Sequence, residues 1–172
     1  MADIFVSYAR EDRAWVADFT ALLTRTYGWT VWWDREIQVG EEFDRVIERE
    51  LAEARCVIVV WSSCSVESNW VRSEARAAQQ ARKLVPLRRD EAQLPIEFTS
   101  IHTANLADFS RDPTHSGFDE VCRAIRARIQ RNDASAAVMS YAVERKGVKP
   151  TSSARRWLGS GLLVAGAMTV LY

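Results

Sequence analysis

The chain has 172 residues, 23 basic and 23 acidic side chains, and a formal net charge of zero. This length holds one domain with room for a further segment, and the charge balance does not favour a general nucleic-acid-binding protein. The three cysteines form no Cys-x-x-Cys pair and there are two scattered histidines. We therefore expect neither a disulfide scaffold nor a metal site.

Strands and helices are expected to alternate along the first part of the chain. Residues 3–7 and 30–33 are short apolar runs and are interpreted as buried strands. A helix is predicted between them from apolar side chains at helical spacing, Trp15, Val16, Phe19, Leu22 and Leu23, with Gly28 as its stop signal. After a polar loop at residues 34–42, an amphipathic helix is expected over residues 43–54.

The alternation continues after residue 55. Residues 56–61 are apolar throughout and predict a central parallel strand covered on both faces. An Ala-rich helix follows from about Ser68 to Arg82, then a strand at 83–87 whose Pro86 indicates an edge or a bulge. A short fifth strand is expected within residues 99–106. Ser116 and Asp119 resemble a capping box for a last helix with one apolar face, Phe118, Val121, Cys122, Ile125 and Ile129.

Repeated strand–helix units predict an α/β protein with a parallel sheet and helices on both faces. Right-handed crossovers leave few topologies, of which a flavodoxin-like doubly wound sheet of about five strands is the simplest. We place this domain at residues 1–130 and a basic, polar and partly helical linker at residues 131–156.

Residues 157–172 contain no charged side chain and are interpreted as a membrane segment that follows the linker. As a helix they would span roughly 24 Å, less than the ~30 Å of a bilayer core, so the sequence would be truncated or the segment would only dip into the membrane. Arg155, Arg156 and Trp157 resemble an interfacial anchor, and positive flanks stay on the cytoplasmic side. Residues 1–156 are therefore expected in the cytoplasm. The alternative is a core helix of a larger domain.

A ligand of a doubly wound sheet binds outside the carboxyl ends of its strands. The residues expected there are Ser7, Tyr8, Arg10, Trp33 and Asp34, together with Trp70 and Glu74 in the helix after residue 61. Trp70 and Glu74 are one helical turn apart and share a face. Aromatic rings beside a carboxylate, a hydroxyl and a guanidinium suit a ligand with flat bases and polar sugars. The alternative for this pair is a packed Trp beside a solvated Glu.

Other prominent side chains have simpler interpretations. Trp32 and Trp33 point to opposite faces by strand alternation, and we expect Trp33 to face the ligand. Trp15 and Trp29 are expected to pack, and Arg88 with Arg89 to form a solvated turn. Cys56 is expected in the core, whereas Cys64 lies in a turn and can be exposed.

Two stretches resemble the Toll/interleukin-1 receptor (TIR) domain in its bacterial form. "DIFVSYAREDRAWV", residues 3–16, is similar to the first sequence box of that family, and residues 28–78 are similar to its second box through the third helix. The third box is not obvious, and "IEFTSIHTANL", residues 96–106, is its nearest counterpart. The resemblance covers residues 1–130 and implies a flavodoxin-like fold and, in many bacterial members, NAD⁺ glycohydrolase activity without a cofactor.

The resemblance also implies roles for individual residues. Glu74 falls on the catalytic glutamate of the family and Trp70 on its WxxxE tryptophan. Ser7, Tyr8, Arg10, Trp33 and Asp34 match positions that line the nucleotide cleft. Nicotinamide leaves NAD⁺ as a neutral ring, so one ionised carboxylate beside the ribose cation would suffice. We expect a protein activated by self-association that cleaves NAD⁺ in bacterial stress or phage defence.

Two other readings stay open at this point. The domain can be a non-catalytic scaffold that pairs with other TIR domains through the loop at 34–42, which includes Ile37 and Gly40. A response-regulator-like receiver would need an acidic pair after its first strand and an Asp at the end of its third. Ser7-Tyr8 and Trp61-Ser62 occupy those places, which argues against a receiver.

Overall fold

The computed structural model describes residues 2–33 and 43–147. Its strands form a five-stranded sheet in the order β2-β1-β3-β4-β5, and every neighbouring pair is parallel. This is the flavodoxin-like order, so the predicted fold class is confirmed. The strands are β1 (Ile4–Ser7), β2 (Val31–Trp32), β3 (Cys56–Trp61), β4 (Leu84–Arg88) and β5 (Ala104–Asn105).

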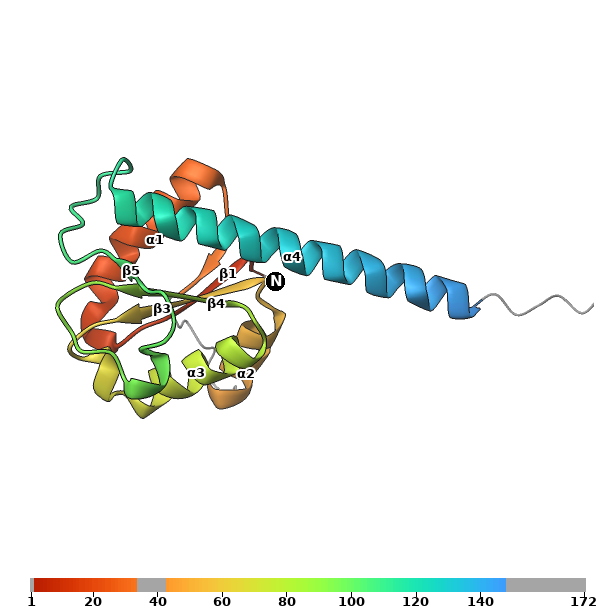
Figure 1. The fold of residues 1–172 in the computed structure, drawn as a ribbon, viewed down its shortest axis with the longest axis horizontal. Helices are drawn as coiled ribbons and strands as arrows, with labels where there is room; N and C mark the ends of the chain where they lie inside the picture. Colours follow the sequence, from red (N-terminus) through yellow and green to blue (C-terminus); the bar gives the residue numbers. More distant parts are fainter. Residues whose placement is uncertain (1, 34–42, 148–172) are drawn as a thin grey trace, which may run out of the picture. The chain divides into compact units, whose positions relative to one another are not determined.

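Helices cover both faces of this sheet (Figure 1). One face carries α1 (Arg13–Tyr27) and the first turns of α4 (Ser116–Gly147), and the other carries α2 (Phe43–Glu53) and α3 (Asn69–Gln80). Three short 3-10 helices lie in the connections: η1 (Arg10–Asp12), η2 (Ser65–Glu67) and η3 (Ile96–Phe98). Right-handed crossovers between parallel strands place the helices in this way.

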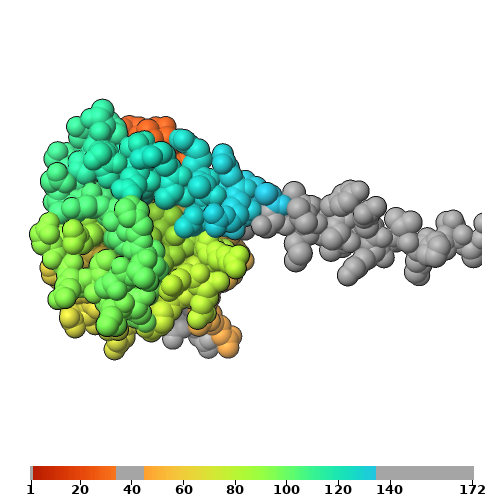
Figure 2. All heavy atoms as spheres, in the orientation of Figure 1, coloured from red at the N-terminus to blue at the C-terminus, as the bar shows by residue number. Residues whose placement is uncertain are grey.

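The core follows the periodicities of the sequence. Along β1, Ile4 and Val6 pack against α1 and α4, while Phe5 packs on the side of α2 and α3. All residues of β3 are buried, as expected for a central strand. In the space-filling view, the segments around β4 and β5 and the start of α4 make up much of the visible face (Figure 2). The apolar stripes predicted for α1 and α4 are confirmed, and Gly28 ends α1 with a positive φ of 70°.

Two local predictions need correction. Pro86 is not on an edge strand, because β4 lies between β3 and β5. Pairing with β5 begins only at Leu87, so the missing N–H of Pro86 breaks no bond on that side. The first turn of α4 is capped by His115, whose Nδ1 accepts from the N–H groups of Gly117 and Phe118, and not by a Ser116–Asp119 box.

The predicted linker and tail lie mostly outside the described residues. Helix α4 extends through Gly147, so the first part of the predicted linker is helical. Residues 148–172, which include the predicted membrane segment, are not described. Within residues 2–33 and 43–147, no helix combines the length and the apolar character that a membrane crossing requires.

Candidate active site

The connections β1–α1 and β3–α3 lie at the same edge of the sheet, because β1 and β3 are adjacent and parallel. The first connection contains Tyr8 and Arg10 and leads through η1 into α1. The second leads through η2 into α3, whose first turn is capped by Ser68 Oγ accepting from Val71 N–H at 3.3 Å. Both connections therefore stand where a doubly wound sheet binds its ligand.

Helix α3 buries a carboxylate on its apolar face. Val71, Ala75 and Ala78 pack against β1 and β3 residues, and Glu74 lies on the same face with only 5% of its surface exposed. Removing a carboxylate from water is costly unless it has polar partners. A buried acid at a ligand-binding edge is therefore a strong candidate for a functional group.

Trp70 provides a polar partner for this acid. Its indole Nε1–H donates a hydrogen bond of 2.5 Å to Glu74 Oε1, and Trp70 as a whole is 37% exposed. The prediction that the two residues share a helix face is confirmed. The alternative of a packed Trp beside a solvated Glu is wrong, because the acid is buried and the ring is exposed.

The exposed ring of Trp70 lines a hollow of about 380 Å³, which we call the Trp70 cleft. One wall is formed by residues 8–11 of the β1–α1 connection. The other wall comes from the β3–α3 connection and α3, namely Cys64, Glu67, Ser68, Trp70 and Val71. The structure thus brings three of the predicted residues, Tyr8, Arg10 and Trp70, to one cleft, with Glu74 hydrogen-bonded to its wall.

The remaining predicted residues lie around or outside this cleft. Ser7 is fully buried, and its Oγ has no hydrogen-bond partner among the described residues. The ring centroids of Trp33 and Tyr8 are 6.4 Å apart, and Trp33 packs against the core on the side of α1 and α4. Trp32 stacks on Phe5 on the other face of the sheet. The predicted alternation of the two rings is confirmed, but Trp33 does not line the Trp70 cleft. Asp34, Ile37 and Gly40 lie outside the described residues.

Sequence reasoning missed a buried polar cluster beside the cleft. Asp12 is 3% exposed and accepts hydrogen bonds of 2.6 Å from both Ser62 Oγ and Arg89 Nη1. Burial raises the pKa of Asp12 above its usual value, and the bonds from Ser62 and Arg89 oppose that effect. The prediction of a solvated turn at Arg88 and Arg89 is therefore wrong, because Arg88 is the last residue of β4 and Arg89 binds the buried Asp12. Arg89 stands in a run of charged residues, 88–91, which is typical of an exposed turn and gave no sign of its contact with Asp12.

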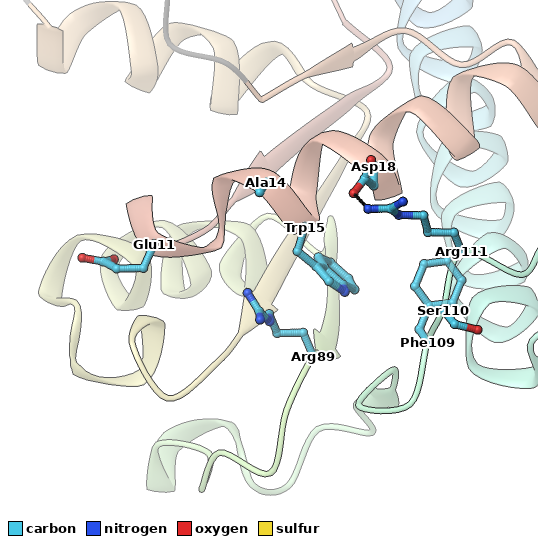
Figure 3. A pocket seen from close by; sticks show the side chains of 8 residues that line it. All are labelled: Glu11, Ala14, Trp15, Asp18, Arg89, Phe109, Ser110 and Arg111. Carbon is cyan, nitrogen blue, oxygen red and sulfur yellow. Dashed lines mark hydrogen bonds and ion pairs between the residues drawn. The ribbon is translucent and has the colours of Figure 1, made fainter.

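A second hollow, of about 550 Å³, is larger than the Trp70 cleft and is here called the Trp15 pocket. In Figure 3 the ring of Trp15 lies between the side chains of Arg89 and Phe109, and Arg111 reaches toward Asp18. Its cations already have acidic partners, Asp12 for Arg89 and Asp18 for Arg111. We assign the site to the smaller cleft, because that hollow adjoins the buried acid on α3.

Comparisons with known proteins agree with this architecture. The family model described as "TIR domain" matches residues 4–122. A solved structure, the TIR domain of the Toll-related receptor TRR-2 from Hydra magnipapillata, is 20% identical, has a TM-score of 0.63 and covers 73% of this chain and 99% of its own. At this identity the likeness shows the fold.

Two curated relatives are also similar to the chain. NAD(+) hydrolase TcpA from a Theionarchaea archaeon is 28% identical over 136 residues, 73% of this chain and 40% of the relative. The 2' cyclic ADP-D-ribose synthase BtTIR from Bacteroides thetaiotaomicron is 33% identical over 73 residues, 42% of this chain and 25% of the relative. The matched region therefore spans two fifths or less of the length of either relative.

Proposed function

This chain belongs to the TIR domain family, and on that basis we propose that it cleaves NAD⁺ at the bond between nicotinamide and ribose. The observation that carries the proposal is the buried Glu74 carboxylate, hydrogen-bonded to Trp70 at the wall of the Trp70 cleft. The names of the two curated relatives, an NAD⁺ hydrolase and a cyclic ADP-ribose synthase, support the same substrate.

The chemistry of NAD⁺ fits a site with one acid. Its nicotinamide is a pyridinium cation that leaves as a neutral ring, so the leaving group needs no proton. This differs from ordinary glycoside hydrolysis, which uses a second carboxyl group as the acid. Positive charge develops on the ribose as the bond breaks. A carboxylate beside that carbon stabilises the transition state more than the ground state, which is the requirement for catalysis.

Glu74 and three residues of the Trp70 cleft have a part in this proposal. Glu74 stabilises the ribose cation from a water-poor position, where electrostatic interactions are stronger than in bulk water. Trp70 holds the carboxylate through its N–H and offers the exposed part of its ring to the dinucleotide. Arg10 is exposed at the rim and is suited to a phosphate, and Tyr8 offers a ring and a hydroxyl beside it. NAD⁺ is the substrate, and the reaction needs no separate cofactor.

The proposal extends to the setting of the domain. Self-association with other TIR domains activates the enzyme, with Ile37 and Gly40 in the contacting loop. Residues 157–172 attach the chain to a membrane, with the TIR domain in the cytoplasm, and the activity serves bacterial stress or phage defence. These parts rest on the sequence alone, because the loop and the tail lie outside the described residues.

The test is NAD⁺ turnover by the full chain, followed by release of nicotinamide and of linear or cyclic ADP-ribose over a wide range of protein concentration. We expect Glu74→Gln to lower kcat/KM by about a hundredfold or more, since it removes the charge that faces the cation. Glu97→Gln is the matched control, because Glu97 also contacts α3, through Arg72 and Arg76, but lines neither hollow.

Equal turnover in wild type and Glu74→Gln would remove Glu74 from the chemistry. A wild-type chain that self-associates, as measured by sedimentation, but releases no nicotinamide at any concentration would instead support the scaffold reading.

A further inference from the structure

We propose that Asp12 is a positioning residue that fixes the two walls of the Trp70 cleft relative to each other. This inference rests on the proposed function, since it assigns a role in NAD⁺ binding to a residue outside the cleft. It concerns a carboxylate that lines neither hollow.

The first step is the place of Asp12 in the chain. It ends η1, the short helix that directly follows Tyr8 and Ala9, so it belongs to the connection that forms one wall of the cleft. Its backbone N–H donates to the carbonyl of Ala9 at 2.8 Å. The backbone of this wall is therefore a tight turn, and the Asp12 side chain extends from its end into the protein.

The second step is what the carboxylate binds. Oδ2 accepts from Ser62 Oγ and Oδ1 accepts from Arg89 Nη1, each at 2.6 Å. Ser62 directly follows β3, and Arg89 directly follows β4. A single buried carboxylate thus ties the β1–α1 connection to the carboxyl ends of two neighbouring strands. Hydrogen bonds to an ionised group are short and directional, so they hold a defined geometry.

The third step links Ser62 to the opposite wall. Ser62 N–H donates to Ser65 Oγ at 2.7 Å, and Ser65 N–H donates to Ser62 Oγ at 3.0 Å. This reciprocal pair closes the turn that carries Cys64 and η2 and leads to Ser68 and Trp70. Asp12, Ser62 and Ser65 therefore form a continuous buried chain of hydrogen bonds behind the cleft, with one wall at each end.

Burying the Asp12 carboxylate costs free energy, so the stability of the fold alone does not account for this network. Asp12 is only 3% exposed, and burial raises the pKa of its carboxyl group, opposed by the hydrogen bonds from Ser62 and Arg89. Replacing a buried ion pair by apolar side chains is often neutral or stabilising for a fold. A directional tie between two loops, in contrast, is what a preorganised binding site requires.

The experiment compares matched substitutions in the full chain. Ser62→Ala removes the hydroxyl that joins the two walls, and Ser63→Ala removes the neighbouring hydroxyl, which is exposed and donates to Asp90 instead. Asp12→Asn removes the charge, and Asp3→Asn makes the same change at the opposite edge of the sheet, where Asp3 binds Thr30 and Arg55. Each variant is measured for KM and kcat with NAD⁺, for thermal stability, and for amide hydrogen exchange.

We expect Ser62→Ala and Asp12→Asn to raise KM at least about fivefold, with a smaller change in kcat, because both walls contact substrate before and during the reaction. Amide exchange in residues 8–12 and 62–68 should become at least about fivefold faster, as expected for a local loss of order. Ser63→Ala and Asp3→Asn should leave KM and these exchange rates unchanged, whatever they do to thermal stability.

An unchanged KM and unchanged exchange in Ser62→Ala would overturn the inference, as would equal changes in the paired controls. The exchange readout keeps this test separate from the proposed function. If the wild type turns over no NAD⁺, the proposed function fails. Faster exchange of both walls then still supports the tie through Asp12, and unchanged exchange refutes it.

Discussion

Trp70 and Trp15 each line a hollow beside the β1–α1 connection, and Glu11 lines both hollows. Their partners differ in kind. Trp15 stacks on Phe19 at 5.1 Å between ring centroids, meets Phe109 edge-on, and lies beneath the guanidinium of Arg89 at 5.9 Å. Trp70 is 37% exposed and donates its indole N–H to a buried acid, Glu74.

The difference shows why the size of a hollow does not identify a site. The Trp15 pocket is the larger, but its aromatic residues join the hydrophobic core and its cations are bound to acids of this chain. The Trp70 cleft is smaller and adjoins a carboxylate held away from water. Substitutions can test whether this contrast between packing and chemistry is real.

Among substitutions of the residues that line the two hollows, the largest effect is expected from Trp70→Phe, which keeps an aromatic ring but removes the N–H that binds Glu74. A hydrogen bond to a charged group is worth about 1.5–3 kcal/mol, so kcat/KM for NAD⁺ should fall about tenfold or more. Trp15→Phe is the matched control and should keep kcat/KM. The contrast breaks down if the two variants lose activity to the same extent.

Next in size is Gly117→Ala, which acts on the side of the Trp15 pocket. A Cβ at Gly117 would lie 2.2 Å from the carbonyl oxygen of Asn105, so β5 and the start of α4 must move apart. Overpacking of this kind costs about 1–3 kcal/mol of unfolding free energy, measured by urea denaturation. Turnover per folded molecule should be kept, and a selective loss of kcat/KM would mean that this side contributes to the site.

A smaller and pH-dependent effect is expected from Asp3→Asn, far from both hollows. Burial opposes the charge, but hydrogen bonds from Thr30 and Arg55 outweigh it and hold the pKa of Asp3 below its usual 3.8. The folded state therefore binds this proton less tightly than the unfolded state. The stability from Asp3 is fully present above pH 3.8 and is lost as the pH falls through the lowered folded pKa.

Unfolding free energy should accordingly differ between wild type and Asp3→Asn by about 1 kcal/mol near pH 7, and by less below about pH 4. Denaturation series at several pH values measure this difference. If the difference in unfolding free energy between wild type and Asp3→Asn became larger at low pH, the predicted pH dependence of the Asp3 contribution would be wrong.

The smallest effect is expected from Arg111→Ala. Its ion pair with Asp18 is at the rim of the Trp15 pocket, and the Arg111 side chain is 71% exposed. Exposed pairs contribute about 0–1 kcal/mol, so thermal stability and NAD⁺ turnover should both stay close to wild type. A clear loss of turnover would make the Trp15 pocket part of the site after all.

Most of the fold could be predicted because its signals are local. The apolar run of β3 and the helical spacing of Val16, Phe19 and Ile125 predict elements that the structure confirms, with boundaries within two residues for β3 and α1. The capping of α4 could not be predicted in this way. Histidine is a less common N-terminal cap than serine. The capping by His115 also depends on the orientation of its ring, which is held by a hydrogen bond of 3.0 Å between His115 Nε2 and Asp108 Oδ1.

The candidate site was predicted in part. Trp70 and Glu74 are four residues apart in one helix, so their contact follows from helical geometry. Which of the two would be buried does not follow, because it depends on how α3 is rotated against the sheet. The pattern of Val71, Ala75 and Ala78 indicates that rotation only when Glu74 is accepted as part of an apolar face.

The parallel α/β fold and the pairing of Trp70 with Glu74 could be predicted from the sequence, because both depend on periodicities within single elements. The contacts of Asp12 with Ser62 and Arg89, by contrast, arise only when the chain is folded. These residues come from three connections separated by 50 and 27 positions. Their contact follows from the order of the strands in space, which brings the carboxyl ends of β1, β3 and β4 to the same edge.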